Sequence, residues 1–179
     1  PANGHTFLQC VTYSGHNPFI LPDELKRIDF TGNMPERMRD YMIMANYTDH
    51  AIGSFIKTLR SQEKFANTMI VITGDHEGLA GDREELCKSE AGKGVVSEGL
   101  YTPFIVINSP VGMRYDKVMG QVDMYPTILN LLQLDNYEWT GLGQSILDPG
   151  KKGFAVNPQL QVIGDTEGAS EEEIEHAKA

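Results

Sequence analysis

The chain has 179 residues, of which 40% are hydrophobic and 22% charged, a composition typical of one folded domain that buries a core. Its formal net charge of −10 and sequence pI near 4.9 exclude the basic surface that a nucleic-acid partner requires. No apolar run approaches the roughly 20 residues that span a bilayer, and two cysteines, Cys10 and Cys87, are too few for a disulfide framework.

The first predicted element is a buried strand over His5–Tyr13. This run is rich in apolar and β-branched residues and stops at Ser14 and Gly15, which form a turn signal. A loop that contains His16 follows. Because the chain starts abruptly at Pro1, close to this strand, we expect the natural protein to extend upstream.

A long amphipathic helix is predicted over residues 33–60. Pro35 suits its first turn, and the cations Lys57 and Arg60 suit its last turn, where they complement the helix dipole. Apolar residues recur there at three- and four-residue steps, namely Met38, Tyr41, Met42, Ala45, Ile52, Phe55, Ile56 and Leu59. The methionines Met38, Met42 and Met44 are interpreted as core residues.

Two further strands are predicted, over Thr68–Thr73 and Thr102–Asn108. Both are short, continuous apolar runs, which favour strands covered on both faces. The polar stretch between them has no clear periodicity, and connections of that length are usually functional or disordered.

The last third of the chain predicts a helix from Tyr125 to Leu132, which Asp123 would cap. A hairpin around Pro158 and a short acidic helix follow. Ser170 and Glu173 form the capping-box pattern that opens this last helix.

This order of elements predicts an α/β fold, a layered α/β/α domain with a mostly parallel sheet that is incomplete at its N-terminus. Residues 1–150 would form the C-terminal portion of a catalytic domain, with the hairpin and acidic helix of 151–179 peripheral to it. Ligands of such sheets gather beyond the carboxyl ends of strands. His16 and His76 both follow predicted strands.

Asp75 and His76, directly after the strand over Thr68–Thr73, are the sharpest candidate site. A carboxylate and an imidazole offer the oxygen and nitrogen ligands that suit zinc or manganese. The same pair also suits a simple turn with a capping aspartate. Two ligands do not complete a metal site, so others must come from elsewhere.

Four segments in the same order resemble motifs of the lipoteichoic-acid-synthase-like branch of the alkaline phosphatase/sulfatase superfamily. Together they cover about residues 6–134. They are Ser14–Phe19 (S-x-H-x-P-F), Tyr47–Ile56 (Y-T-D-x-A-I-G-x-F), Thr68–Gly78 (T-x-I-V-x-x-G-D-H) and Val122–Leu129 (D-x-x-P-T-I-L).

The resemblance implies one divalent metal ion, manganese or zinc, with magnesium as a third candidate. Asp75 and His76 match two of the family's metal ligands. The family's nucleophilic threonine and its acidic ligand have no match here, so we expect this chain alone to be inactive. His16 matches a histidine that faces the substrate phosphate, which implies a catalytic and substrate-binding role; the alternative is a loop residue packed on Pro18 and Phe19.

Arg83, in the polar stretch after the metal pair, is a candidate for binding a phosphate through two parallel hydrogen bonds. The alternative is a solvated loop charge.

The resemblance implies a metal-dependent phosphotransferase or hydrolase that acts on phosphoglycerol- or phosphoethanolamine-type esters of lipid head groups. A sulfatase or phosphodiesterase of the same fold, and a non-catalytic binding domain, stay open as alternatives. The expected partners are a phospholipid-derived phosphate or sulfate ester and the upstream half of the same domain. The expected location is extracytoplasmic, tethered to the membrane only through an upstream anchor.

Overall fold

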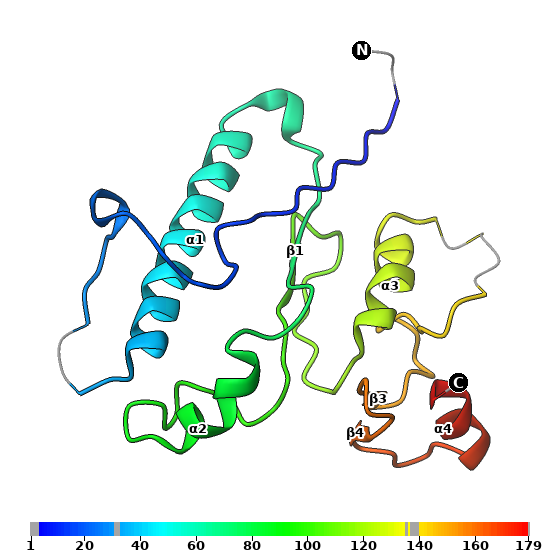
Figure 1. Cartoon of the computed structure of the whole chain (residues 1–179). Helices are drawn as coiled ribbons and strands as arrows, with labels where there is room; N and C mark the ends of the chain where they lie inside the picture. The colour runs from blue at the N-terminus through cyan, green and yellow to red at the C-terminus, as the bar shows by residue number, and fades with distance from the viewer. Residues whose placement is uncertain (1–3, 31–32, 135, 137–139, 179) are drawn as a thin grey trace. The chain divides into compact units, whose positions relative to one another are not determined.

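The longest element, helix α1 (Glu36–Arg60), confirms the helix predicted over residues 33–60. In the computed structural model, which describes residues 4–30, 33–134, 136 and 140–178, the chain divides into two compact units. The first comprises Pro1–Thr68 and Ile72–Pro103, and the second Met69–Val71 and Phe104–Ala179. The ribbon in Figure 1 labels the main elements.

In the first unit, the core forms around the N-terminal half of α1. Met38 is fully buried, and Met44 is nearly so, which confirms the core role of these methionines. Three short 3-10 turns complete the unit with helix α2 (Arg83–Lys88): η1 (Asp23–Leu25), η2 (Glu63–Phe65) and η3 (Ala80–Asp82). The buried apolar cluster consists of Phe19, Leu21, Met38, Ile43, Met44, Leu79 and Leu86.

Helix α2 lies within the polar stretch whose sequence shows no clear periodicity. It has six residues and buries only Leu86. Because a helical period needs several apolar positions to show, one buried leucine in under two turns leaves no pattern in the sequence. The helix forms because Leu86 reaches the core of the first unit.

The buried strand predicted over His5–Tyr13 is wrong. The described part of this segment pairs with no strand, and its large side chains are exposed, with Phe7 at 85% and Tyr13 at 84%. A strand exists through its pairing, because its backbone N–H and C=O groups need partners. The composition of His5–Tyr13 suits a strand, but among the described residues no strand lies beside it to pair with.

The second unit contains the predicted helix and the tail. β1 (Ile70–Thr73), of which only the first two residues belong to this unit, pairs with β2 (Phe104–Ile107), which confirms strands at both predicted positions. The 3-10 turn η4 (Gln121–Asp123) leads directly into α3 (Met124–Leu131). Asp123 occupies the N-cap position of α3, as predicted, but its side chain makes no capping bond to that helix; its buried carboxylate accepts a hydrogen bond from the backbone N–H of Gly120, the capping-box bond of η4.

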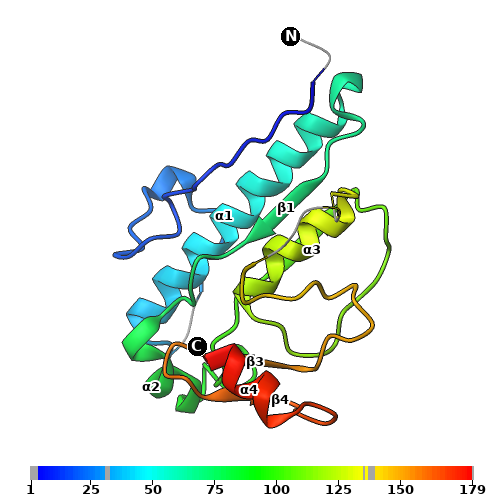
Figure 2. The same ribbon diagram turned by 90° about the vertical axis from the view of Figure 1, so that its right-hand side faces the viewer.

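The C-terminal hairpin and helix are confirmed. β3 (Phe154–Val156) pairs antiparallel with β4 (Val162–Gly164), and α4 (Glu171–Lys178) packs against β3, as Figures 1 and 2 both show. The capping box of α4 is also present: Ser170 N–H donates to the Glu173 carboxylate at 2.7 Å, and Glu173 N–H donates to the Ser170 hydroxyl at 3.1 Å.

The described residues thus form helices and two sheets of two strands each. β3 and β4 are antiparallel, so the layered, mostly parallel sheet stays a prediction about the complete domain. The boundary predicted at residue 150 falls inside the second unit. Among the helices that the structure describes, none is both long enough and apolar enough to cross a bilayer.

Candidate metal and phosphate site

Asp75 and His76 lie in the loop that leaves β1 and point their side chains toward each other. Oδ2 of Asp75 lies 3.7 Å from Nε2 of His76, while Oδ1 accepts a hydrogen bond from the His76 backbone N–H at 3.0 Å. Two ligands each about 2.1 Å from a tetrahedral zinc ion are roughly 3.4 Å apart. The observed separation therefore fits two donors that share one divalent cation.

The imidazole of His76 is held in the tautomer that a metal ligand requires. Its Nδ1 lies 2.8 Å from the carbonyl oxygen of Glu77, and because a carbonyl only accepts, Nδ1 must carry the proton. In the neutral ring, Nε2 then has an available lone pair. Ligating histidines in metalloproteins are oriented by this same kind of bond from the other ring nitrogen.

The bond to Glu77 also affects protonation. This hydrogen bond first, and then the charge of Asp75, raise the pKa of His76 above its ordinary value of 6.5. In the doubly protonated ring, Nε2 also carries a proton, and a metal that binds Nε2 must displace it. Metal binding to this form of His76 therefore releases a proton.

The pair is open to solvent, with the side chain of Asp75 88% exposed and that of His76 68% exposed. Within the residues that the structure describes, no three His, Cys, Asp or Glu side chains come together to hold a metal. The chemistry of the two donors fits a divalent cation, and completing its coordination requires ligands from outside this set or from water.

His16 resembles His76 in its local geometry. Its Nδ1 donates to the carbonyl oxygen of the next residue, Asn17, at 2.5 Å, so Nε2 is the ring nitrogen that this bond does not use; the residue is exposed. The ring also stacks on Tyr13, with centroids 5.8 Å apart and planes 9° from parallel. The loop is fixed at its far end by Phe19, which is buried in the core against α1.

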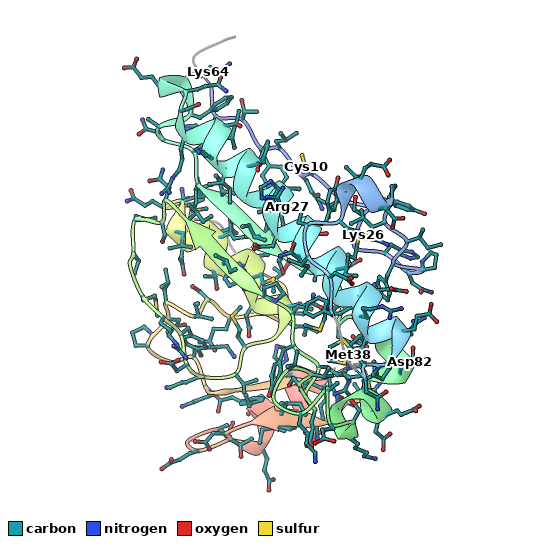
Figure 3. All side chains as sticks on the ribbon, turned by 90° about the vertical axis from the view of Figure 1, so that its left-hand side faces the viewer. Cys10, Lys26, Arg27, Met38, Lys64 and Asp82 are labelled. Carbon is teal, nitrogen blue, oxygen red and sulfur yellow. The ribbon has the colours of Figure 1, made fainter. Side chains whose placement is uncertain are left out.

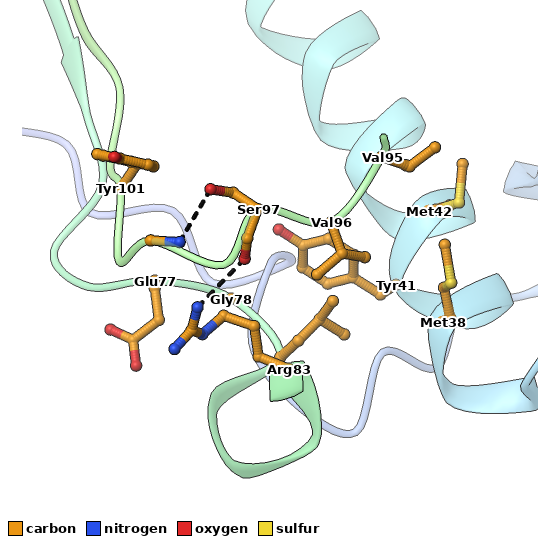
Figure 4. Close-up of a pocket in the computed structure, with 12 residues that line it drawn as sticks. Met38, Tyr41, Met42, Glu77, Gly78, Arg83, Val95, Val96, Ser97 and Tyr101 are labelled. Carbon is orange, nitrogen blue, oxygen red and sulfur yellow. Dashed lines mark hydrogen bonds between the residues drawn. The ribbon is translucent and has the colours of Figure 1, made fainter. Parts of the chain in front are cut away.

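Arg83, at the start of α2, points back toward the segment before β2. Its Nη1 donates to the carbonyl oxygens of Ser97, at 3.2 Å, and Glu98, while Nε is buried without a hydrogen-bond partner. The residue lines a cavity of about 180 Å³ beside Glu77 and Tyr41 (Figure 4). Part of its donor capacity is thus used within the chain, and phosphate binding by Arg83 stays a prediction.

Comparison with known proteins identifies the family of the chain. The family model described as Sulfatase matches residues 1–134, three quarters of the chain, including the loops of His16 and of Asp75 and His76. The chain belongs to the sulfatase family. Membership implies an α/β fold of the alkaline-phosphatase type.

This sulfatase-family chain is similar to two named proteins. It is 26% identical over 155 residues to the lipoteichoic acid synthase-like protein YvgJ of Bacillus subtilis, covering 82% of the chain and 25% of that protein. It is 25% identical over 146 residues to the lipoteichoic acid synthase of Staphylococcus aureus, covering 78% of the chain and 22% of that protein. The chain thus spans about a quarter of the length of these relatives.

Arg37 and Tyr41 contact segments next to His16 and next to His76, and neither was among the predicted site residues. Both lie in the first two turns of α1, and Tyr41 was interpreted only as part of the apolar stripe. Their four-residue spacing predicts that they share one face of the helix. The spacing does not predict which segments that face contacts.

Proposed function

We propose that this chain is the C-terminal part of a metal-dependent phosphotransferase or hydrolase that acts on phosphoglycerol- or phosphoethanolamine-type esters of lipid head groups. The observation that carries the proposal is the convergence of Asp75 Oδ2 and His76 Nε2, 3.7 Å apart, with Nδ1 of His76 held by Glu77. The names of the two relatives favour phosphotransfer over sulfate ester hydrolysis.

The proposed ligands from this chain are Asp75 and His76, and the cation is manganese, zinc or magnesium. A bound divalent ion supplies positive charge next to the oxygens on which negative charge develops in the transition state. The remaining ligand and the nucleophile, a threonine, are proposed to lie upstream of Pro1. This chain alone is therefore expected to bind the cation weakly and to turn over no substrate.

His16 is proposed to act on the substrate phosphate. Because its Nδ1 already donates to Asn17, the ring donates to a phosphoryl or leaving oxygen only from Nε2, and only when it is the doubly protonated imidazolium. A donor placed where charge develops contributes in the transition state and much less in the ground state. Loss of His16 should therefore lower kcat more than it raises KM.

The proposed setting is the outer face of a membrane. The net charge of −10 disfavours spontaneous approach to an anionic lipid surface, so an anchor upstream of this chain is part of the proposal. The layered parallel sheet of the alkaline-phosphatase type is likewise proposed to be completed by that upstream segment.

The test uses the protein with its upstream segment, assayed on vesicles that contain fluorescent phosphatidylglycerol and, separately, on an aryl sulfate. We expect release of diacylglycerol that stops on chelation and returns with Mn²⁺, and no release of sulfate. The variants Asp75→Ala and His76→Gln should abolish release, whereas Asp49→Asn and His50→Gln, exposed positions on α1, should not. Sulfate release alone would establish the sulfatase alternative, and metal-independent release would refute the proposed site.

A further inference from the structure

Tyr41 on α1 contacts both loops of the candidate site. Its ring meets Phe19, three residues after His16, edge to face, with centroids 5.2 Å apart and planes at 77°. It also abuts Gly78, two residues after His76, so closely that a Cβ at Gly78 would lie 2.5 Å from Oη and 2.6 Å from Cε2 of Tyr41. A side chain at Gly78 would therefore have to displace the Tyr41 ring (Figure 4).

Arg37, one helical turn earlier, contacts the His16 loop and η3, the 3-10 turn that follows the loop of Asp75 and His76. Its Nη1 donates to the side-chain oxygen of Asn17 at 3.1 Å, and its guanidinium lies over the Phe19 ring, 5.5 Å from the centroid. Its Nε forms an ion pair with Asp82, six residues after His76. Figure 3 labels Met38, the residue that follows Arg37 in α1, and shows Asp82 at the same end of the helix.

These contacts reach the two histidines through short covalent paths. Asn17, which Arg37 holds by its side chain, provides the carbonyl that fixes Nδ1 of His16. Gly78, which the Tyr41 ring backs, adjoins Glu77, whose carbonyl fixes Nδ1 of His76. Each histidine is therefore oriented by a carbonyl within one residue of a contact made by α1.

We propose that Arg37 and Tyr41 act as one positioning element that sets the separation between the His16 loop and the loop of Asp75 and His76. The inference rests on the proposed function. That function explains why the separation matters: it is the distance between His16, which would bind the substrate phosphate, and the two proposed metal ligands. Neither residue is catalytic, since each acts through the backbone that bears a histidine.

The first experiment measures the loop separation without metal or substrate. Nitroxide labels on cysteines that replace Gly15 and Gly81, where an added side chain meets open space, report the distance by electron paramagnetic resonance. Native Cys10 and Cys87 are first replaced by serine. Arg37→Gln and Tyr41→Leu should each broaden and shift the distance distribution, and Tyr41→Phe, which keeps the ring, should largely restore it.

Two matched controls isolate the contact from general damage to α1. Arg39→Gln removes a cation that pairs with Glu36 and Asp40 of its own helix, and it should leave the distance unchanged. Gly78→Ala should reproduce the effect of Tyr41→Leu, because its Cβ displaces the ring, whereas Gly53→Ala, which meets open space on α1, should not. An unchanged distance in folded Arg37→Gln and Gly78→Ala would overturn the inference.

The second experiment ties the separation to the site. Substoichiometric Mn²⁺ should broaden the ring resonances of both His76 and His16 in the unaltered chain, an effect that falls steeply with distance from the ion. In Arg37→Gln the broadening should persist at His76 and be lost at His16, a change that a merely structural role would not produce selectively. If Mn²⁺ broadens neither histidine, the proposed metal site fails, while the label distances still decide whether the positioning element exists.

Discussion

Asp75 in the first unit and Asp123 in the second are both aspartates of family-like motifs, and the structure surrounds them in opposite ways. The Asp75 side chain is 88% exposed beside His76, whereas the Asp123 side chain is 6% exposed. Asp123 accepts hydrogen bonds from the backbone N–H groups of Gly120, at 2.8 Å, and Gln144, at 2.9 Å, and pairs with Lys151 at 3.2 Å.

This difference in burial predicts a structural role for Asp123 and none for Asp75. A buried carboxylate whose oxygens are already bound by the protein has little capacity left for a ligand, and it holds local structure together. An exposed carboxylate contributes little to stability, so the position of Asp75 next to an oriented imidazole leaves it available for the ligand role proposed above. Mutations at the two sites should therefore affect different measurements.

The largest expected effect is on stability, from Asp123→Ala. This change leaves the Lys151 ammonium, whose side chain is 8% exposed, without its carboxylate, and breaking a buried pair in this way costs about 3–5 kcal/mol. Urea denaturation followed by circular dichroism measures the loss. Asp75→Ala, an exposed site, should change the free energy of unfolding by no more than about 0.5 kcal/mol.

A double variant sharpens this result. Asp123→Ala combined with Lys151→Met removes both charges and should recover part of the lost stability, because an apolar pair needs no compensation for desolvation. Equal losses for Asp75→Ala and Asp123→Ala would contradict the comparison.

Thr127 provides a smaller test of the same buried network. Its hydroxyl donates to the Asp123 carbonyl at 2.6 Å and accepts the Ile146 N–H at 3.1 Å, and the residue is buried. Thr127→Val should cost about 1–3 kcal/mol, because it leaves a buried N–H unsatisfied. Thr58→Val is the matched control, since Thr58 is an exposed residue of α1 whose hydroxyl donates to the carbonyl oxygen of Ser54, four residues earlier. A similar cost at both positions would mean that the network adds nothing.

The sequence predicted elements whose signal is local. α1 and β1 carry their own apolar pattern, and the capping box of α4 is visible as Ser170 followed by Glu173. The pairing of Asp75 with His76 was also predictable, because adjacent residues after a strand share one loop.

Features that depend on distant partners were not predictable. His5–Tyr13 has the composition of a strand but lies exposed, because strand formation requires a neighbour that composition does not specify. Asp123 has the sequence position of a cap, yet its partners Gln144 and Lys151 lie more than twenty residues away. The contacts of Tyr41 with Phe19 and Gly78 are likewise tertiary.

Next in size is the loss of metal affinity at the exposed pair. His76→Gln should weaken Mn²⁺ binding by more than about tenfold, because even removal of a group that only orients a ligand costs roughly 10–100-fold. Titration followed by the electron paramagnetic resonance signal of free Mn²⁺ measures the change in the protein with its upstream segment. His50→Gln, at an exposed position of α1, should leave the affinity unchanged. Equal affinities for the two variants would exclude His76 as a ligand.

The smallest expected effect is a pH dependence at Glu173, an exposed carboxylate bound within its own helix turn. The hydrogen bonds from the backbone and the hydroxyl of Ser170 lower the pKa of Glu173 below its ordinary value of 4.5. Since the folded form holds the proton less tightly than the unfolded form, capping stabilises α4 fully above pH 4.5. That stabilisation is lost as the pH falls through the lowered pKa.

The amide chemical shifts of Ile174 should therefore move toward random-coil values on acidification, and Ser170→Ala should remove most of this transition. Glu171→Gln, outside the capping box, should keep it. An Ile174 transition that survives Ser170→Ala unchanged would mean that the capping box does not stabilise the first turn of α4. The exposed Glu173 carboxylate would then contribute nothing to the stability of this helix.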